Sequence, residues 1–316
     1  MRHTLRMIGF IVLCLVLGWV LRLSGKFPAN SPHAFNSFIL YVSFPALILI
    51  QIPDLVKSLT FTTGLLVPVS MAWIQFGLSY LFFSWLGRKR RWSDAKTGAL
   101  VLCAGLGNTS FVGFPLLESL LGPEAIRYGV LVDQPGSFLT LSTVALIYAT
   151  AKSPIASRKP SVREITRRIF TFPPFVILLL AVAWGMGGGS AQGIWREILA
   201  RLSHTLVPLA LISVGFQLSL SPAVLRKHTV ALSSGLAFKL LFIPAFFTVF
   251  YVYLFNASGP MTRVTLLESA MAPMITAAIV AEEFGFDTEI ANLMLGIGIP
   301  VSLITVPLWN TFWSAV

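Results

Sequence analysis

Two apolar stretches of the chain are interrupted near their centres by residues that break helices and cap helix ends. The first interruption reads CAGLGNTSFVGFP at residues 103–115, and the second reads SAMAPMIT at residues 269–276. Glycine and proline weaken the helical hydrogen-bond ladder, and the run Asn108, Thr109, Ser110 favours a helix N-terminus. Two half-helices that meet in this way would present unpaired N–H groups and positive dipole ends, which bind an anion without a buried arginine or lysine.

Four polar side chains within apolar stretches are further candidates, because burying them in a membrane costs free energy. They are Asp133, Gln134, Lys239 and Glu268. Asp133 fits either a proton or cation site or a structural carboxylate at the membrane interface. For Lys239 we favour an ion pair with Asp133 or Glu268 over direct contact with a substrate, since a buried lysine can serve structure alone. No spacing of histidine, cysteine and carboxylate residues resembles a metal site, so none is expected.

The composition is that of a membrane protein. Of the 316 residues, 56% are hydrophobic and 11% are charged, and the mean hydropathy is +0.82. A soluble core of this size does not carry so few charges, so we expect many membrane spans. The net charge of +11 does not indicate a nucleic-acid partner, because the basic residues form short clusters between apolar runs, as in cytoplasmic loops. No small-residue cleavage site follows the first apolar run, which we interpret as a helix rather than a signal peptide.

Ten apolar spans lie between the charged residues and have about the length that a bilayer requires. They cover residues 7–23, 34–52, 62–86, 97–117, 126–150, 171–186, 198–217, 229–254, 263–282 and 289–313. Of the 23 lysine and arginine residues, fifteen lie in connectors on one side of these spans and seven on the other, with Lys239 inside a span. The more basic side is predicted to be cytoplasmic, which places both termini outside.

The spans divide into two sets of five, at residues 1–150 and 171–316, joined by a basic cytoplasmic linker at residues 151–170. An odd number of spans in each set requires opposite orientations, which is the inverted-repeat arrangement of many secondary transporters. We therefore predict an all-α polytopic membrane protein with ten transmembrane helices in two inverted five-helix repeats, whose broken fourth and ninth helices cross.

Two pairs of prolines support a duplication of this kind. Pro45 in YVSFPALILI and Pro208 in SHTLVPLALIS lie 163 positions apart, and Pro115 and Pro273, in the fourth and ninth spans, lie 158 positions apart. The offsets are nearly equal, as one duplication event predicts. Prolines are frequent in membrane helices, so the offsets add to the orientation argument and do not replace it.

Four segments resemble the motifs of the auxin efflux carrier family, which includes bacterial dicarboxylate permeases and plant auxin exporters. In chain order they read FILYVSFPALIL, GNTSFVGFPLLESLLG, VPLALISVGFQLSL and AMAPMITAAIVAEEFGFD, and they span almost the whole sequence. The family lies within the superfamily of bile acid, arsenite and riboflavin transporter-like proteins. The resemblance implies a scaffold formed by helices 1, 2, 6 and 7 and a mobile transport domain formed by helices 3–5 and 8–10.

The resemblance also carries over to particular residues. Asn108 matches the asparagine at the family's helix crossing, and Pro115 matches the proline that follows it. The ninth-span motif departs from the common pattern of two prolines and an asparagine. Here Ala272 replaces the first proline, Pro273 keeps the second, and Thr276 stands in place of the asparagine. This departure argues against auxin as the substrate.

From these observations we expect a secondary transporter, and not an enzyme, that moves small organic anions such as mono- or dicarboxylates by an elevator-like motion in the cell inner (plasma) membrane. The alternatives are a sodium-coupled symporter of a larger amphipathic organic anion and a non-transporting membrane sensor. The expected substrate-binding residues are Gly107, Asn108, Thr109, Pro115, Met271, Pro273 and Thr276. The residues expected to support coupling are Asp133, Gln134, Lys239 and Glu268.

The expected partners are the organic anion, the lipid bilayer and a second copy of the chain in a homodimer, and no nucleic acid. No cofactor is expected, and H⁺ and Na⁺ are the candidate coupling ions.

Overall fold

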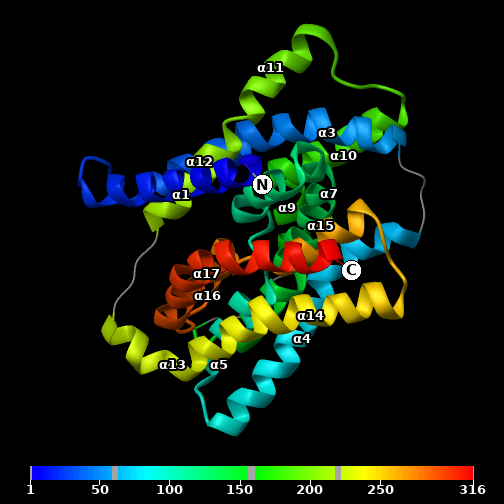
Figure 1. Cartoon of the computed structure of the whole chain (residues 1–316). Helices are drawn as coiled ribbons and strands as arrows, with labels where there is room; N and C mark the ends of the chain where they lie inside the picture. The colour runs from blue at the N-terminus through cyan, green and yellow to red at the C-terminus, as the bar shows by residue number, and fades with distance from the viewer. Residues whose placement is uncertain (1, 59–62, 156–160, 218–221, 316) are drawn as a thin grey trace. The chain divides into compact units, whose positions relative to one another are not determined.

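The computed structural model describes residues 2–58, 63–155, 161–217 and 222–315, which fold almost entirely as helices (Figure 1). The described residues contain no β-strand, and an isolated backbone bridge joins Gly107 to Pro273. Each of the ten predicted spans coincides with helical structure, and the prediction of an all-α protein is confirmed. The inverted repeat stays a prediction.

The helices follow the predicted spans closely, with additional interruptions. In the first half of the chain they are α1 (Arg2–Leu23), α2 (Ser31–Phe38), α3 (Phe44–Ser58), α4 (Leu66–Arg90), α5 (Asp94–Gly105), α6 (Phe114–Leu121), α7 (Ile126–Val132), α8 (Leu146–Lys152) and α9 (Val162–Phe170). In the second half they are α10 (Pro173–Met186), α11 (Gly193–Ser203), α12 (Leu206–Gln217), α13 (Pro222–Ala237), α14 (Ile243–Phe247), α15 (Pro260–Ser269), α16 (Ile275–Glu283) and α17 (Thr288–Ala315).

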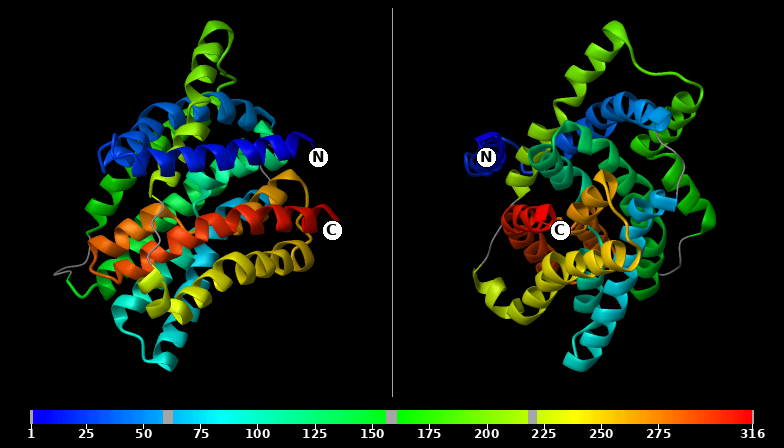
Figure 2. Two further views of the ribbon diagram at one scale, coloured as in Figure 1. Left: turned by 60° about the vertical axis from the view of Figure 1, so that its left-hand side comes forward. Right: turned by 45° about the vertical axis from the view of Figure 1, so that its right-hand side comes forward.

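Short segments of other helix types connect several of these helices. The π-helical segments are η1 (Ile39–Ser43), η3 (Thr109–Gly113), η5 (Asp133–Phe138), η6 (Leu141–Ala145), η7 (Phe238–Phe242) and η8 (Thr248–Leu254). The 3₁₀ turns are η2 (Thr63–Leu65) and η4 (Pro123–Ala125). The segments α13, η7, α14 and η8 follow one another without a gap and form one long rod, which is yellow in Figures 1 and 2.

Among the residues that the structure describes, six helical segments are long and apolar enough to cross a membrane. They are Ser31–Lys57, Leu66–Arg90, Pro123–Lys152, Gly193–Gln217, Leu225–Leu254 and Thr288–Ser314, and shorter apolar helices cover Gly9–Leu23, Thr109–Leu121 and Pro173–Met186. Large apolar side chains such as Leu13, Leu81 and Ile304 are exposed on these helices, as lipid-facing residues are in membrane proteins. The protein is therefore polytopic, whereas the count of ten crossings stays a prediction.

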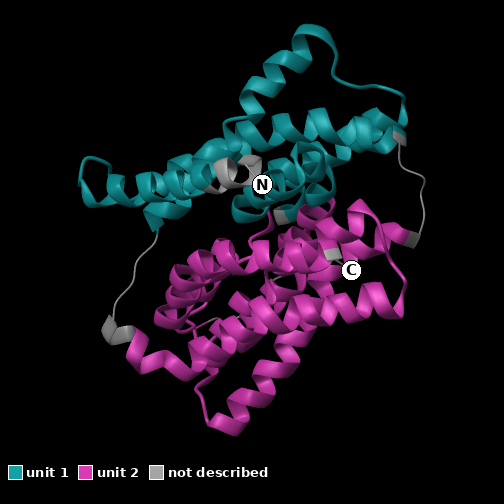
Figure 3. Cartoon of the chain, in the orientation of Figure 1, with its two compact units in different colours: residues 1–62, 110–130, 167–218 teal, residues 63–109, 131–166, 219–316 magenta. Residues whose placement is uncertain are grey.

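The chain packs into two compact units, which Figure 3 colours separately. Unit 1 consists of Met1–Thr62, Ser110–Val130 and Arg167–Leu218, and unit 2 consists of Thr63–Thr109, Leu131–Thr166 and Ser219–Val316. Each half of the sequence contributes to both units, and the fourth predicted span is divided between them, with α5 in unit 2 and α6 in unit 1. The labels scaffold and transport domain stay predictions, because packing alone does not show which unit moves.

Unit 1 is held together by close helix contacts at glycines. A Cβ atom added to Gly18 of α1 would lie 2.1 Å from the carbonyl oxygen of Ile212 in α12, and one added to Gly215 of α12 would lie 2.1 Å from the carbonyl oxygen of Leu15. Without side chains at these two positions the backbones of α1 and α12 can touch, which is how membrane helices associate when lipid supplies no hydrophobic driving force.

Unit 2 packs α4 and α17 against the interrupted helices. Within the membrane-spanning part of α4, Gln75 Nε2 donates to the carbonyl of Ala104 at 3.1 Å and Ser79 Oγ donates to that of Val101 at 3.0 Å. The carbonyl of Ala104 is one of the last four in α5, which have no partner within the helix, whereas Val101 lies one residue before these four. Gln75 of α4 therefore satisfies a carbonyl at the C-terminal end of α5, and Ser79 adds a second contact to the same helix.

Prolines explain three of the π-helical segments. The segments η1, η3 and η7 each end two residues before a proline, namely Pro45, Pro115 and Pro244. A proline has no N–H to donate, and its ring pushes away the carbonyl four residues earlier, which widens the preceding turn. For Pro244 that carbonyl belongs to Leu240, and the indole Nε1 of Trp309 in α17 donates to it at 2.9 Å.

Candidate functional site

Both predicted interruptions are present in the structure. Helix α5 ends at Gly105, and Leu106 takes an extended conformation (φ −126°, ψ 128°) before helical structure resumes at Thr109. Helix α15 ends at Ser269, and α16 begins at Ile275. The fourth and ninth predicted spans are therefore broken helices, as predicted.

The two interruptions pair with each other through their backbones. The N–H of Asn108 donates to the carbonyl of Ala272 at 2.8 Å, and the N–H of Met274 donates to that of Leu106 at 3.0 Å. These bonds flank an antiparallel bridge between Gly107 and Pro273, and we call this pairing the crossing.

The expectation that the second half of the fourth span presents unpaired N–H groups stays a prediction. The structure adds that the N–H of Asn108, which directly precedes this half-helix, donates to the ninth span. The physical reason is that an unpaired backbone group costs several kcal/mol where no water can reach it. The first i to i−4 bond at the start of α16 runs from Ala278 to Met274. The N–H groups of residues 275–277 precede it and are the ones that helix geometry leaves available.

Pro115 also lies differently from the expectation. The structure places it at the start of α6, within helical structure that continues from Thr109 to Leu121, and not at the break itself. Its missing donor widens the turn before it instead of ending the helix. Pro115 belongs to unit 1, whereas the other predicted site residues belong to unit 2.

Buried polar side chains surround Asp133. Its two carboxylate oxygens accept hydrogen bonds from Thr109 Oγ1 at 2.5 Å and from Gln134 Nε2 at 2.6 Å. Asp133 and Gln134 are buried, and both belong to the π-helical segment η5, a helix form that is frequent at functional sites. The structure thus connects two of the predicted support residues to the fourth-span break through Thr109.

Lys239 and Glu268 lie near the ninth-span break. Both are fully buried, and neither Glu268 carboxylate oxygen accepts a hydrogen bond from the residues that the structure describes. Lys239 Nζ donates to the carbonyl of Ser269, the last residue of α15, at 2.7 Å. Lys239 and Asp133 both interact electrostatically with Glu268. The favoured ion pair of Lys239 is therefore an attraction to Glu268 without a direct hydrogen bond.

Two glycines allow close backbone approach at the crossing. A Cβ atom added to Gly107 would lie 3.3 Å from Lys239 Nζ and 3.4 Å from the carbonyl oxygen of Glu268. On the ninth span, a Cβ atom added to Gly298 of α17 would lie 2.7 Å from the ring of Pro273.

Of the remaining predicted residues, Met271 is fully buried within the second break, and Thr276 is half-buried in the first turn of α16.

Sequence reasoning missed Gln75 and Gly298, which support the crossing from neighbouring helices. Gln75 was detectable in principle, since it is an amide side chain in the middle of an apolar span. Gly298 could not have been found from the sequence. Its segment GIGIP resembles many apolar helices, and only the structure shows that it packs against Pro273.

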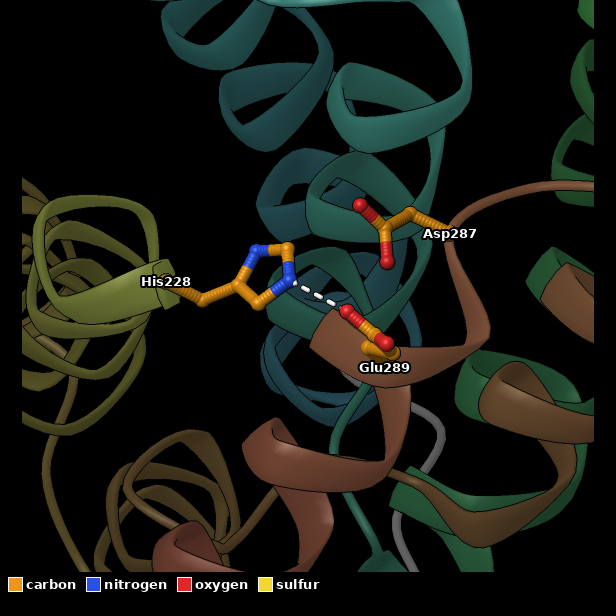
Figure 4. Close-up of side chains that lie close together, drawn as sticks. All are labelled: His228, Asp287 and Glu289. Atoms are coloured by element: carbon orange, nitrogen blue, oxygen red, sulfur yellow. Dashed lines mark hydrogen bonds and ion pairs between the residues drawn. The ribbon is translucent and has the colours of Figure 1, made fainter. Parts of the chain in front are cut away.

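A second polar cluster, away from the crossing, joins α13 to α17. The side chains of His228, Asp287 and Glu289 bring their ligand atoms within 4.8 Å of one another (Figure 4). Glu289 Oε2 lies 2.8 Å from His228 Nε2 and 2.6 Å from the ammonium of Lys227. We predicted no metal site because no spacing of histidine, cysteine and carboxylate residues in the sequence resembles one. The ammonium already beside Glu289 makes the cluster an ion-paired link between helices.

The comparisons with known proteins agree with a membrane transporter. A family model described as membrane transport protein matches residues 4–310. An uncharacterized transporter of Methanothermobacter thermautotrophicus is 29% identical over 312 residues, which are 95% of each chain. An uncharacterized transporter of Methanocaldococcus jannaschii is 26% identical over 305 residues, covering 95% of this chain and 96% of the relative.

A bacterial relative is more distant. An uncharacterized transporter of Escherichia coli K12 is 22% identical over 310 residues, covering 95% of this chain and 94% of the relative. The matches extend over almost the whole chain, including both interrupted helices. The chain therefore belongs to the membrane transport protein family, the auxin efflux carrier-like family that its motifs resemble.

Proposed function

We propose that the protein is a secondary transporter that moves small organic anions, such as mono- or dicarboxylates, across the cell inner membrane. The observation that supports this proposal best is the crossing. There the backbone bonds from Asn108 to Ala272 and from Met274 to Leu106 join the start of α16 to the break that holds the buried side chains of Asn108 and Thr109. Helix N-termini favour negative charge because their N–H groups are unpaired and the helix dipole is positive there.

In this proposal the substrate carboxylate is bound by few groups. Asn108, Thr109 and Thr276 supply side-chain hydrogen bonds, and the first N–H groups of α16 supply backbone donors. Gly107 and Pro273 keep the two backbones in register, Met271 lines the second break, and no side chain at Gly107 obstructs the approach. Pro115 acts indirectly, by shaping the helix that follows Asn108.

The transport motion proposed is elevator-like, with the predicted transport domain of helices 3–5 and 8–10 moving as one body. All of the proposed substrate and support residues lie in these predicted spans, so such a motion would carry the site without breaking its hydrogen bonds. Both termini are proposed to lie outside the cytoplasm, and the chain is proposed to act as a homodimer.

Asp133, Gln134, Lys239 and Glu268 are proposed to couple transport to a cation, with H⁺ and Na⁺ as the candidates. The alternative, a sodium-coupled symporter of a larger amphipathic anion, would need a Na⁺ site near Glu268. Its fully buried carboxylate has no hydrogen-bond donor among the described residues and is attracted to the ammonium of Lys239.

The direct test is uptake by purified protein in proteoliposomes. Radiolabelled acetate, succinate and taurocholate represent a monocarboxylate, a dicarboxylate and a larger amphipathic anion, each supplied with and without a sodium gradient. Saturable uptake of acetate or succinate supports the proposal, and sodium-dependent uptake of taurocholate alone supports the alternative.

A thermal-shift screen against a panel of organic acids accompanies the uptake assay, since a ligand stabilises the folded state by mass action. Binding of an acid without uptake of any anion would indicate the non-transporting sensor.

A further inference from the structure

We propose that the ammonium of Lys239 occupies the cation position of the crossing, so that the protein binds its anion without sodium. The statement about the anion rests on the proposed function, whereas the statement about the cation position does not. The proposal assigns to a residue of the chain the role that a dissolved coupling ion has in other transporters.

The position of Lys239 Nζ supports the assignment. In transporters with broken helices, the C-terminal ends of half-helices and unwound backbone carbonyls coordinate Na⁺. Lys239 Nζ donates at 2.7 Å to the carbonyl of Ser269, which is the C-terminal residue of the half-helix α15. The adjacent Glu268 attracts the ammonium electrostatically. An ammonium carries the same charge as Na⁺, and here it binds a carbonyl of the kind that coordinates sodium in those transporters.

A comparison with Gln75 shows that the hydrogen bond alone does not require a charge. Gln75 donates to Ala104 near the end of the half-helix α5, as Lys239 donates to Ser269 at the end of α15. The two donors lie 164 positions apart, close to the offset of 163 between Pro45 and Pro208.

The chain therefore caps one half-helix with a neutral amide and the corresponding one with a buried lysine. A fully buried lysine is costly without an opposite charge nearby, and Glu268, also fully buried, precedes Ser269 directly. At the end of α5, the residue before the acceptor Ala104 is Cys103, so no adjacent carboxylate needs a balancing charge there. The positive charge of Lys239 thus serves to balance Glu268, since the hydrogen bond to the carbonyl of Ser269 would not require a charge.

Several contacts hold Lys239 in place. It lies in the widened turn η7 that precedes Pro244, and Trp309 donates to the carbonyl of the next residue, Leu240. Its other neighbour, Phe238, stacks on Phe82 with 5.0 Å between ring centroids. These contacts fix the backbone from which the ammonium reaches the crossing, so its position does not depend on the long side chain alone.

The test compares the effect of cations on the melting temperature of purified protein. Wild type is measured in sodium chloride and in N-methyl-D-glucamine chloride at equal ionic strength, and the two values are expected to agree. Lys239→Ala leaves the carbonyl of Ser269 and the Glu268 carboxylate without their cation. This variant is expected to be stabilised saturably by Na⁺ or methylammonium at millimolar concentrations.

Three further variants separate charge from packing. Lys239→Gln keeps a donor for Ser269 and removes the charge, so it should respond to cations less than Lys239→Ala but more than wild type. The double variant Lys239→Ala with Glu268→Gln should not respond, because no charge is left to balance. Gln75→Ala is the matched control: it removes the cap of α5 and should lower the melting temperature without any cation response.

Two outcomes would overturn the proposal. One is a specific stabilisation of wild type by Na⁺, which would show an open sodium site beside Lys239. The other is a folded Lys239→Ala protein that responds to no cation. If Lys239→Ala does not fold, Lys239→Gln takes its place, and a folded Lys239→Gln protein that responds to no cation would overturn the proposal. None of these measurements uses an organic anion, so they are independent of whether anion uptake is found.

Discussion

The backbone N–H of Asn108 donates to Ala272, so its side chain is not required to hold the two broken helices together. The side chain is buried beside Gly107 and Thr109, at the point where the fourth span changes from extended to helical structure. An amide offers both a donor and an acceptor, and it can therefore bind an anion or a protonated acid without carrying a charge itself.

Asn108→Ala should reduce the affinity for the organic anion while leaving folding nearly intact. The expected loss is about 1–3 kcal/mol, the scale of a polar partner left unsatisfied. Substrate titration monitored by thermal shift measures this loss. Ser70→Ala is the control, since it removes a hydroxyl that pairs with Tyr251 at 2.8 Å in the same unit but away from the crossing. Wild-type affinity in Asn108→Ala would place the anion elsewhere.

At the scale of helices, the position of a proline relative to a break decides what it does. Pro273 lies inside the second break, with its ring close to Gly298, whereas Pro115 lies in a continuous helix and only widens a turn. Two prolines that look equivalent in the sequence therefore have different structural roles. Glycines at 105 and 107 keep the first break open without a proline, whereas Ala272 leaves the second break to Pro273.

Pro115→Ala and Pro273→Ala should differ in their effect on transport. Pro115→Ala restores a backbone donor in the helix and should raise stability, since a proline within a helix costs about 3 kcal/mol. Pro273→Ala allows the ninth span to continue as a helix across the break and should reduce the uptake rate strongly. Uptake rate and unfolding midpoint are measured for both. A double variant that transports at the wild-type rate would contradict a site formed by the breaks.

Pro244→Ala should move Lys239 away from the crossing. Without the missing donor the wide turn η7 can close into an α-helix, in which each residue rotates by about 100° around the helix axis. Lys239 should then lose its bond to Ser269, and a melting temperature that depends on Na⁺ should appear as in Lys239→Ala. Pro300→Ala in α17 is the control, because that proline lies inside an α-helix. No sodium response in a folded Pro244→Ala protein would argue against this role of the turn.

At the scale of the whole molecule, positive charge sets the orientation. Single cysteines placed at Arg90 and Ser161 should react with a membrane-impermeant maleimide only from the cytoplasm, and one at Val316 only from outside. The native Cys14 and Cys103 are buried, so their background labelling should be low. Labelling of the Val316 position from the cytoplasm would rule out ten spans or the predicted orientation.

Local sequence signals predicted the elements of this fold better than the contacts between them. Glycine, proline and asparagine mark both breaks because each acts on its own backbone or on a near neighbour. The bond from Asn108 to Ala272 and the cap by Gln75 escaped prediction, because each joins residues on different helices. The sequence of one helix does not reveal which residues of other helices will satisfy the backbone groups at its ends.

The backbone pairing at the crossing has a consequence for biogenesis. Asn108 and Ala272 are 164 residues apart, so the ribosome synthesises more than half of the chain between the two partners. Throughout that interval the extended segment around Leu106 has no strand to pair with, and lipid cannot hydrogen-bond it. A nascent chain that stops before residue 260 should thus depend on the translocon or an insertion chaperone to shield this segment. Completion of the substrate site would then be the last step of membrane insertion.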